Sequence, residues 1–376
     1  MNKHPGRFVI GLTGNIATGK SVVRRMLEHL GAYTIDADAL AHRAISKGAP
    51  GYQPVVDCFG KWILDGEGEI DRKKLGNLVF HDPEALVQLE NIIHPHVTQA
   101  IEILTTRATQ SVIVIEAIKL LESPLRDRCD SLWVVHAPEQ VQLERLMRKR
   151  HLSREQALNR IRIQRPQEEK LKVASVSILN TGSYDDLWNQ ISAEWKKISP
   201  AAETQPEIIP SVAGDFYVQR GRPRDTEVIA GLLTRLSKGR RSVSSEEVMA
   251  DFGEKAYLLL RLRDERVGLA GWQVENLVAR TTDLYLDDRI DKTSALGTLI
   301  DEVERASTNL QCEASLVFPG SDLAGEAQAW KNLGYERRTP ETLGIQAWQD
   351  AAVESMPAGT TLFFKLLRQD RVLRPI

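Results

Sequence analysis

The stretch Phe8–Ser21, FVIGLTGNIATGKS, joins an apolar run to a loop that carries two glycines, a lysine and a hydroxyl at fixed spacing. Its second part, Gly14–Ser21, satisfies the P-loop pattern GxxxxGK[ST], in which backbone N–H groups wrap around a phosphate. The run Phe8–Leu12 predicts a buried strand, and the apolar face of Gly19–Leu30 predicts the helix that follows. This strand–loop–helix order predicts a site for the phosphates of a nucleotide at a helix start.

The P-loop residues have separate expected tasks. Lys20 can reach the β- and γ-phosphates, and the Ser21 hydroxyl suits Mg²⁺, so ATP and Mg²⁺ are the expected cofactors. Lys20 is therefore a candidate catalytic residue and Ser21 a candidate metal ligand. The residues expected to contact the nucleotide here are Asn15, Ile16, Ala17, Thr18, Gly19, Lys20, Ser21 and Val22.

Length and composition limit the class of protein. A chain of 376 residues exceeds one ordinary domain, and 42% hydrophobic with 27% charged residues is typical of a soluble globular protein. The net charge of −2 gives the whole chain no strong attraction to nucleic acid or membrane. Three scattered cysteines, without CxxC spacing, suit a reducing compartment. With no secretory signal and no run of ~20 apolar residues, the expected location is cytoplasmic, without membrane or nucleic-acid partners. The sequence leaves the oligomeric state open.

Strands alternate with helices in the first half, which predicts an α/β fold with a parallel sheet. After the first strand, strands are predicted at Ser111–Glu116, Ser131–His136 and Val176–Leu179. The proline-containing stretch around 198–214 shows no period and is the predicted linker. The expected domains are therefore 1–197, the linker 198–214, and 215–376.

Asp36 follows the short run Tyr33–Ile35, which could be the second parallel strand. Ligands bind at the carboxyl ends of such strands, where a carboxylate can accept the proton of an attacking hydroxyl or hold Mg²⁺. Asp36 is thus the predicted catalytic base, although either Asp36 or Asp38 could instead cap the helix predicted at Ala39–Ser46. For Asp38 the two interpretations carry equal weight.

Residues 145–165 form a basic run with a single acid, Glu155. Such a run is a solvated face, a nucleic-acid surface, or a lid that closes over ATP. The run has no aromatic residue, which argues against a stacking site for single strands. Its basic residues are Arg145, Arg148, Lys149, Arg150, Arg154, Arg160, Arg162 and Arg165.

Several segments, taken in order, resemble the dephospho-CoA kinase family. After the P-loop they are Thr34–Arg43 (TIDADALAHR), Phe59–Phe80, with IDR and VF, and Leu89–Val97 (LENIIHPHV). The lid-like segment Leu152–Gln164 and the closing segment Glu168–Ser183 follow. The resemblance covers about residues 8–195. It implies a P-loop kinase fold with a lid and a helical acceptor-binding insert at about 38–103. It also implies a reaction, the phosphorylation of the ribose 3′-hydroxyl of dephospho-CoA by ATP, which is the last step of coenzyme A biosynthesis.

The resemblance also assigns roles to individual residues. Asp36 matches the proposed base, and a lid cation, Arg148 or its rivals Lys149 and Arg150, is expected at the transferring phosphate. Three cations are candidates for this position because the sequence Lys149-Arg150-His151 stands where the family has Arg-Asp-Gly. The remaining implied ligands are Arg160, Asn180 and Gly182 for the nucleotide, and Asp36, Arg43, Arg72, His94 and Gln164 for the acceptor.

Alternatives remain open for some of these residues. His94-Pro95 could be a helix start, and Arg72 could be a surface charge paired with Asp71. Glu116 stands where the family has Asp. It could still serve as an outer-shell Mg²⁺ ligand at the end of its strand, with less certain geometry because its side chain is one methylene longer.

The second half, 215–376, weakly resembles the acetyltransferase superfold. Its predicted elements begin with a strand at Asp215–Gln219 and include a hairpin of Ala256–Arg263 and Val267–Glu275. The segment Arg289–Glu304 stands where that fold binds pyrophosphate, and it has only Gly297 in place of a glycine pair. The domain is therefore expected to have kept the fold and lost or changed the activity.

Two other functions compete with the kinase. One is a nucleotide-gated binding protein with an inactive acceptor site, and the other is a bifunctional chain with acyltransferase activity in its second half. The matches at Asp36 and His94 argue against the first, and the missing glycine pair argues against the second. If the second half is an appendage, a fragment ending near Pro200 should fold and keep kinase activity.

Overall fold

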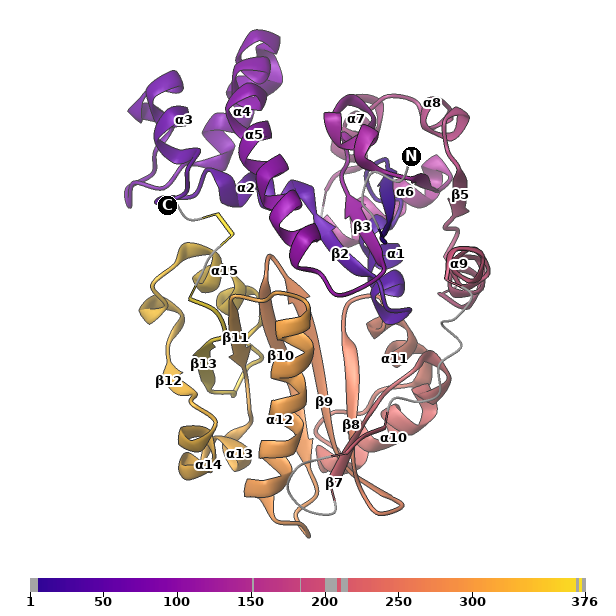
Figure 1. The fold of residues 1–376 in the computed structure, drawn as a ribbon, viewed down its shortest axis with the longest axis vertical. Coiled ribbons are helices and arrows are strands. Elements are labelled where there is room, and N and C mark those ends of the chain that lie inside the picture. The colour runs from indigo at the N-terminus through magenta and orange to yellow at the C-terminus, as the bar shows by residue number, and fades with distance from the viewer. Residues whose placement is uncertain are drawn as a thin grey trace.

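Two sheets organise the chain, one in each half (Figure 1). The computed structural model describes residues 6–150, 152–182, 184–199, 208–210, 216–369 and 372–373. No described helix combines the length and the apolar character that crossing a membrane would need.

The first sheet has five parallel strands in the order β2-β3-β1-β4-β5. Successive residues of β1 enter different hydrophobic cores, since Val9 packs with α2, α3 and α5 and Ile10 packs with α1 and α9. The sheet is therefore covered on both faces, as its continuous apolar runs require. Its strands are β1 (Phe8–Gly14), β2 (Tyr33–Asp36), β3 (Val112–Glu116), β4 (Ser131–His136) and β5 (Val176–Leu179).

The helices of this half confirm the predicted kinase architecture. The P-loop helix is α1 (Lys20–His29), and α9 (Tyr184–Ile198) packs beside it. The insert between β2 and β3 contains α2 (Ala37–Ala44), α3 (Tyr52–Phe59), α4 (Arg72–His81) and α5 (Pro83–Arg107). The lid region contains α6 (Glu139–Arg150), α7 (Arg154–Arg162) and α8 (Gln167–Lys172).

The helix start suggested at His94-Pro95 is wrong. Helix α5 begins at Pro83, where Asp82 caps it by accepting hydrogen bonds from Glu84 N and Ala85 N. A proline in the first turn loses no intrahelical hydrogen bond, so Pro83 suits this position. Pro95 lies inside the helix instead. The prolines alone therefore did not locate the helix start.

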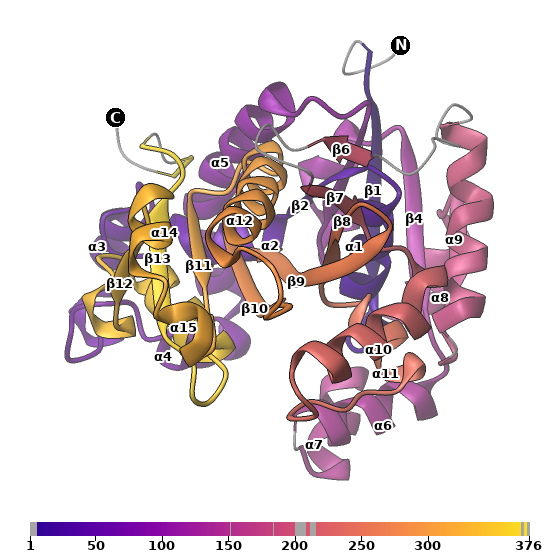
Figure 2. The same cartoon turned by 90° about the horizontal axis from the view of Figure 1, so that it is seen from below.

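The second sheet has eight strands in the order β12-β13-β11-β10-β9-β8-β7-β6 (Figure 2). Among the described strands of this sheet, β10 and β11 pair in parallel and the other neighbours pair antiparallel. This is the second α/β domain that the sequence predicted. The strands are β6 (Ile208–Pro210), β7 (Phe216–Arg220), β8 (Ala256–Leu262), β9 (Glu265–Glu275), β10 (Val278–Leu286), β11 (Ala314–Val317), β12 (Glu336–Arg338) and β13 (Leu362–Leu366).

Helices cover both faces of this sheet. Helix α12 packs on strands β7, β8, β9 and β10. Helix α10 packs on β9 and β10, and helix α15 packs on β10. These helices are α10 (Thr226–Leu236), α11 (Ser245–Asp251), α12 (Lys292–Asn309), α13 (Ser321–Ala324), α14 (Ala327–Asn332) and α15 (Gln346–Ser355).

Part of the predicted linker 198–214 belongs to the second sheet. Helix α9 ends at Ile198, and Ile208–Pro210 pairs antiparallel with β7 as strand β6. The lack of a period in the sequence hid this strand because three residues are too few to show one. Residues 200–207 and 211–214 of the linker lie outside the described residues.

The two halves pack directly against each other. Leu277 and Leu310 of the second half pack on the core of the first, and Tyr184 of the first packs on the core around α10 and α11. His29 at the end of α1 meets the Phe252 carbonyl through Nε2 at 2.9 Å. The tip of the β9–β10 hairpin reaches the edge strand β2, as Figure 1 shows.

Candidate active site

The P-loop connects β1 to α1 through two left-handed residues. Ala17 has φ 58° and Gly19 has φ 92°. A Cβ on Gly19 would lie 2.1 Å from Asn180 Nδ2, so only glycine fits this position. With Gly19 as the N-cap, the first N–H groups of α1 face the loop, which is the arrangement that binds phosphate.

Side chains from distant segments hold the loop in shape. Asn180 donates a hydrogen bond to the Thr18 carbonyl at 2.8 Å, and Arg145 donates to the Ala17 carbonyl at 3.2 Å and to Asn180 Oδ1 at 2.9 Å. Asn180 was predicted at the nucleotide site, whereas Arg145 was not singled out. Nothing in the basic run distinguishes Arg145 from its neighbours, and only the fold shows that it points at the loop.

The end of the lid region touches the same loop. Gln164 Oε1 accepts a hydrogen bond from Ile16 N at 2.6 Å, and Asn15 Nδ2 donates to the Arg165 carbonyl at 2.9 Å. Gln164, predicted as an acceptor ligand, therefore lies against the nucleotide loop. The Lys20 ammonium donates to the Asn15 carbonyl at 3.3 Å and is buried.

Two carboxylates meet at the carboxyl ends of neighbouring strands. Asp36 ends β2, Glu116 ends β3, and the two residues are register partners in the parallel pair. Asp36 is also the N-cap of α2, because its Oδ1 accepts from Ala39 N at 2.8 Å. Asp36 therefore caps helix α2 and also lies at the end of strand β2, so both predicted positions apply to it. Asp38 lies in the first turn of α2, and its Oδ2 accepts from Ile118 N at 3.1 Å.

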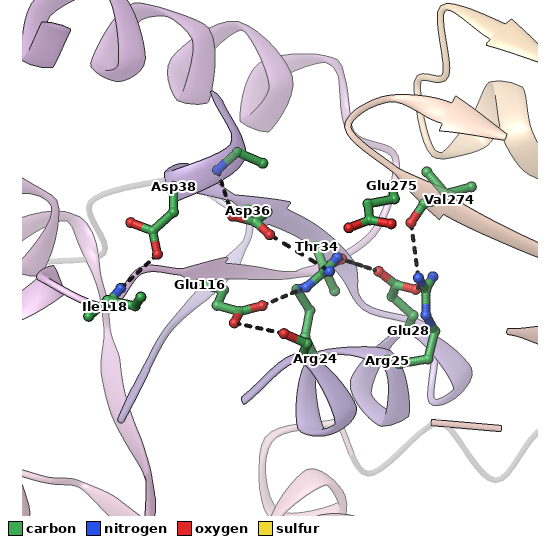
Figure 3. A network of polar contacts seen from close by, with 12 residues as sticks. Arg24, Arg25, Glu28, Thr34, Asp36, Asp38, Glu116, Ile118, Val274 and Glu275 are labelled. Atoms are coloured by element: carbon green, nitrogen blue, oxygen red, sulfur yellow. Dashed lines mark hydrogen bonds and ion pairs between the residues drawn. The ribbon is translucent and has the colours of Figure 1, made fainter. Parts of the chain in front are cut away.

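Arg24 connects these carboxylates (Figure 3). Its Nε lies 2.6 Å from Glu116 Oε2 and its Nη2 lies 3.9 Å from Asp36 Oδ2. Burial opposes the charge of Arg24, but the neighbouring carboxylates, Glu116 first, raise its pKa above the usual value. Arg24 is a site residue that the sequence did not reveal, since it reads there as one more position of an amphipathic helix.

The donor set around Ser21 suits Mg²⁺. Ser21 Oγ lies 3.3 Å from Glu116 Oε1, while the other oxygen of Glu116 faces Arg24. Mg²⁺ takes oxygen ligands, usually one or two from the protein and the rest from phosphates and water. No group of three His, Cys, Asp or Glu side chains suited to a metal occurs among the described residues.

Burial raises the pKa of two acidic groups here. It raises the pKa of Asp38 to about 6, while the hydrogen bond from Ile118 N opposes the shift. Burial also raises the pKa of Glu116, against the opposing charges of Arg24 and Lys20. A cation or a phosphate-bound metal close to these groups would favour their ionised forms.

The predicted acceptor residues lie in different surroundings. Arg72 is exposed at the start of α4, and Asp71 caps that helix through Lys73 N and Lys74 N; in the described residues no ion pair joins Arg72 to Asp71. Burial lowers the pKa of His42, and the positive charge of Arg72 lowers it further. The carboxylate of Asp36 acts in the opposite direction. His42 lies on α2, and the sequence did not single it out. His94 is half-buried in α5.

Arg43 is held by the second domain. Its Nη2 lies 2.6 Å from Glu313 Oε2 and its Nη1 donates to the Asn276 carbonyl at 2.9 Å. The Arg43 side chain is only 9% exposed. Both ends of the guanidinium are thus engaged at the domain contact.

The predicted lid cations whose side chains the structure describes are exposed. Arg148 is exposed on α6 and Arg160 is exposed on α7, while Gly182 follows Asn180 after β5. The side chains of Lys149 and Arg150 lie outside the described residues, so the choice of lid cation stays a prediction.

A parallel sheet with a P-loop, a helical insert between β2 and β3 and a lid defines a P-loop kinase. The family model described as "Dephospho-CoA kinase" matches residues 8–186. A dephospho-CoA kinase from Carboxydothermus hydrogenoformans is 45% identical over 194 residues, which cover 50% of this chain and 94% of that relative. The chain belongs to the dephospho-CoA kinase family.

Solved structures resemble each half. The crystal structure of TT1252 from Thermus thermophilus matches 51% of this chain and 98% of that one, with 35% identity and a TM-score of 0.46. A putative acetyltransferase from Salmonella typhimurium covers 42% of this chain and 96% of its own, with 10% identity and a TM-score of 0.32.

Proposed function

We propose that the first domain transfers the γ-phosphate of ATP to the ribose 3′-hydroxyl of dephospho-CoA and yields coenzyme A. The observation that carries this proposal is the meeting of the P-loop, Ser21 and the two carboxylates Asp36 and Glu116 at one edge of the sheet. A phosphate cradle and a base within one site are what phosphoryl transfer to a hydroxyl requires. The family membership supports dephospho-CoA as the acceptor.

Each group has a chemical task in this proposal. The N–H groups at the start of α1 and the Lys20 ammonium bind the phosphates and stabilise the charge that develops during transfer. Mg²⁺, held by Ser21 Oγ with Glu116, would neutralise phosphate charge. Asp36 accepts the proton of the attacking hydroxyl, and its hydrogen bond to Ala39 N fixes the carboxylate in place.

The other assigned ligands are part of the proposal. Asn180 and Gly182 border the nucleotide site, and Arg148 and Arg160 supply charge when the lid closes. On the acceptor side, His94 and Arg72 bind dephospho-CoA, while Gln164, which accepts a hydrogen bond from Ile16 N, belongs to the nucleotide loop. We also propose a cytoplasmic location and no nucleic-acid or membrane partner.

We propose no acyl transfer for the second domain. Helix α12 begins where an acyl-CoA pyrophosphate would be bound, but Asp291 caps it there by accepting from Ser294 N at 2.9 Å. A carboxylate at that position repels an anionic ligand and uses one of the N–H groups that would bind it. Gly297, the one glycine of the segment, lies within the helix. These features support a domain that kept the fold without this binding mode.

The experiment is a direct assay of the full chain with ATP, Mg²⁺ and dephospho-CoA, followed by detection of coenzyme A. Asp36→Asn should lower kcat by about 10²–10⁴-fold and leave ATP binding nearly unchanged, because the base is lost while the P-loop is intact. A companion assay with acetyl-CoA and a panel of amines should show no product.

Asp57→Asn is the matched control, since Asp57 is exposed on α3 and its carboxylate bonds only with Gln53 among the described contacts. Its kcat should equal that of the unmodified chain. Absence of coenzyme A with the unmodified chain would reject the acceptor, and full turnover by Asp36→Asn would reject the base.

A further inference from the structure

The β9–β10 hairpin of the second domain approaches the segment that carries Asp36. Residues Val274–Leu277 at its tip line a small cavity of about 40 Å³ together with Asp36 and Arg43. A space of that size holds only a few water molecules, and the Asn276 carbonyl at the tip accepts a hydrogen bond from Arg43 of α2. In the first sheet β2 is an edge strand, and this hairpin lies beside it.

One connection runs through Arg43. This arginine sits near the end of α2, whose N-cap is Asp36. Glu313 stands directly before β11 and is 1% exposed, and it makes the buried ion pair with Arg43. The Asn276 carbonyl satisfies the second end of the guanidinium. Helix α2 is therefore fixed at its last turn by the second domain and at its first turn by the Asp36 carboxylate.

A second connection runs through α1 (Figure 3). The Val274 carbonyl accepts a hydrogen bond from Arg25 Nη2 at 2.9 Å, and Arg25 forms an ion pair with Glu28. Glu28 lies 3.4 Å from Arg24, the residue that contacts both Glu116 and Asp36. All three side chains, Arg24, Arg25 and Glu28, are buried. The hairpin thus meets the acceptor side of the site from two directions.

We propose that Glu313 is a positioning residue for the kinase reaction: by holding Arg43, the second domain fixes α2 and sets the place of Asp36 and of the acceptor. The proposal rests on the proposed function for its kinetic part. In this proposal Arg43 does not contact the acceptor, because both ends of its guanidinium are already bonded to the second domain. Arg43 instead acts by holding helix α2 in place.

The test compares Glu313→Gln with the unmodified full-length chain. Removal of the charge should raise the KM for dephospho-CoA at least about fivefold and lower kcat, while the KM for ATP stays within twofold. Amide hydrogen exchange over residues 37–44 should accelerate by a similar factor, and exchange over α6 should not change. Glu313→Asp, which keeps the charge, should restore part of the acceptor KM.

Glu304→Gln is the matched control. Glu304 Oε2 makes an ion pair with Lys365 Nζ at 2.6 Å inside the second domain, the same distance as the Arg43 pair. This variant should leave the acceptor KM and exchange over residues 37–44 unchanged. Equal effects of both variants would mean a general loosening and would overturn the proposal.

Two further outcomes bear on the proposal. A lower acceptor KM in Glu313→Gln would show that Arg43, once released, binds the substrate directly, and it would overturn the positioning role. Should the single variant fail to fold, the double variant R43Q/E313Q removes both charges, and an unchanged acceptor KM there would equally overturn it. If the unmodified chain does not phosphorylate dephospho-CoA, the proposed function fails, and the exchange comparison still decides whether Glu313 fixes α2.

Discussion

Asp36 shows how one residue serves both the fold and the site. Its main chain ends β2, one carboxylate oxygen caps α2, and the other lies 3.9 Å from Arg24. A carboxylate that is held at two places has a fixed orientation, which the proposed base needs. The same restraint makes Arg24 important, because it joins Asp36 to Glu116 and through Glu116 to Ser21.

Asp38 supports a prediction on pH dependence. Burial raises its pKa to about 6 from an ordinary value near 4, so the folded chain binds the proton more tightly than the unfolded chain. The free energy of unfolding therefore falls as pH rises from about 4 to 6 and stays lower above that range. Asp38→Asn should stabilise the chain by roughly 1–2 kcal/mol at pH 7.5, with no gain near pH 3.5.

Chemical denaturation of the two proteins at both pH values measures this difference. The asparagine keeps an acceptor for Ile118 N, so the comparison isolates the charge. An equal effect at pH 3.5 and pH 7.5 would contradict the raised pKa.

At the scale of elements, the P-loop depends on Gly19. Gly19→Ala places a methyl group against Asn180 at a left-handed φ, and Asn180 is the side chain that holds the Thr18 carbonyl. The loop must then shift or Asn180 must leave. We expect the KM for ATP to rise by at least about tenfold, since one misplaced anchor distorts the phosphate cradle. Steady-state kinetics at varied ATP tests this expectation.

Gly297→Ala is the contrasting change in α12. Gly297 is helical, and a Cβ there would have no heavy atom within 4 Å. Alanine should therefore raise the free energy of unfolding by about 0.5–1 kcal/mol and leave kinase kinetics unchanged. Thermal unfolding checks this, and a loss of stability would indicate that the glycine has a role that the helix does not reveal.

At the scale of the whole molecule, the interface decides how independent the halves are. The fragment 1–199 would uncover the buried charges Arg25, Glu28 and Arg43 together with apolar side chains that now face Leu277 and Leu310. We expect it to fold with a Tm lower by about 5 °C or more and to bind ATP. Its acceptor KM should rise as it does in Glu313→Gln, because both lose the same ion pair.

Calorimetry and kinetics of the fragment provide the measurement, with the full chain as the reference. A fragment with the Tm and acceptor KM of the full chain would show that the second domain rests on the kinase without contributing to it. The relative from Carboxydothermus hydrogenoformans is matched over 94% of its length by about half of this chain.

Local patterns were enough for the first sheet. The apolar runs predicted all five strands, because a strand buried on both faces is apolar without interruption. Four of them lie within one residue of their predicted bounds, and β1 is two residues longer than expected. The hairpin of β8 and β9 was also predicted. Strands of three residues, such as β6 and β12, were not, because they are too short for any periodicity.

The sequence by itself determined the P-loop, the position of Asp36 at a strand end and the membership of the family, since these depend on residues that are neighbours along the chain. Only the tertiary structure decided that Arg24 joins Asp36 to Glu116, that Arg145 holds the loop, and that Arg43 meets Glu313 across 270 residues. Charged residues on a helix all read alike in a sequence. Which of them are buried, and against which carboxylate, is settled by packing between segments that the chain keeps far apart.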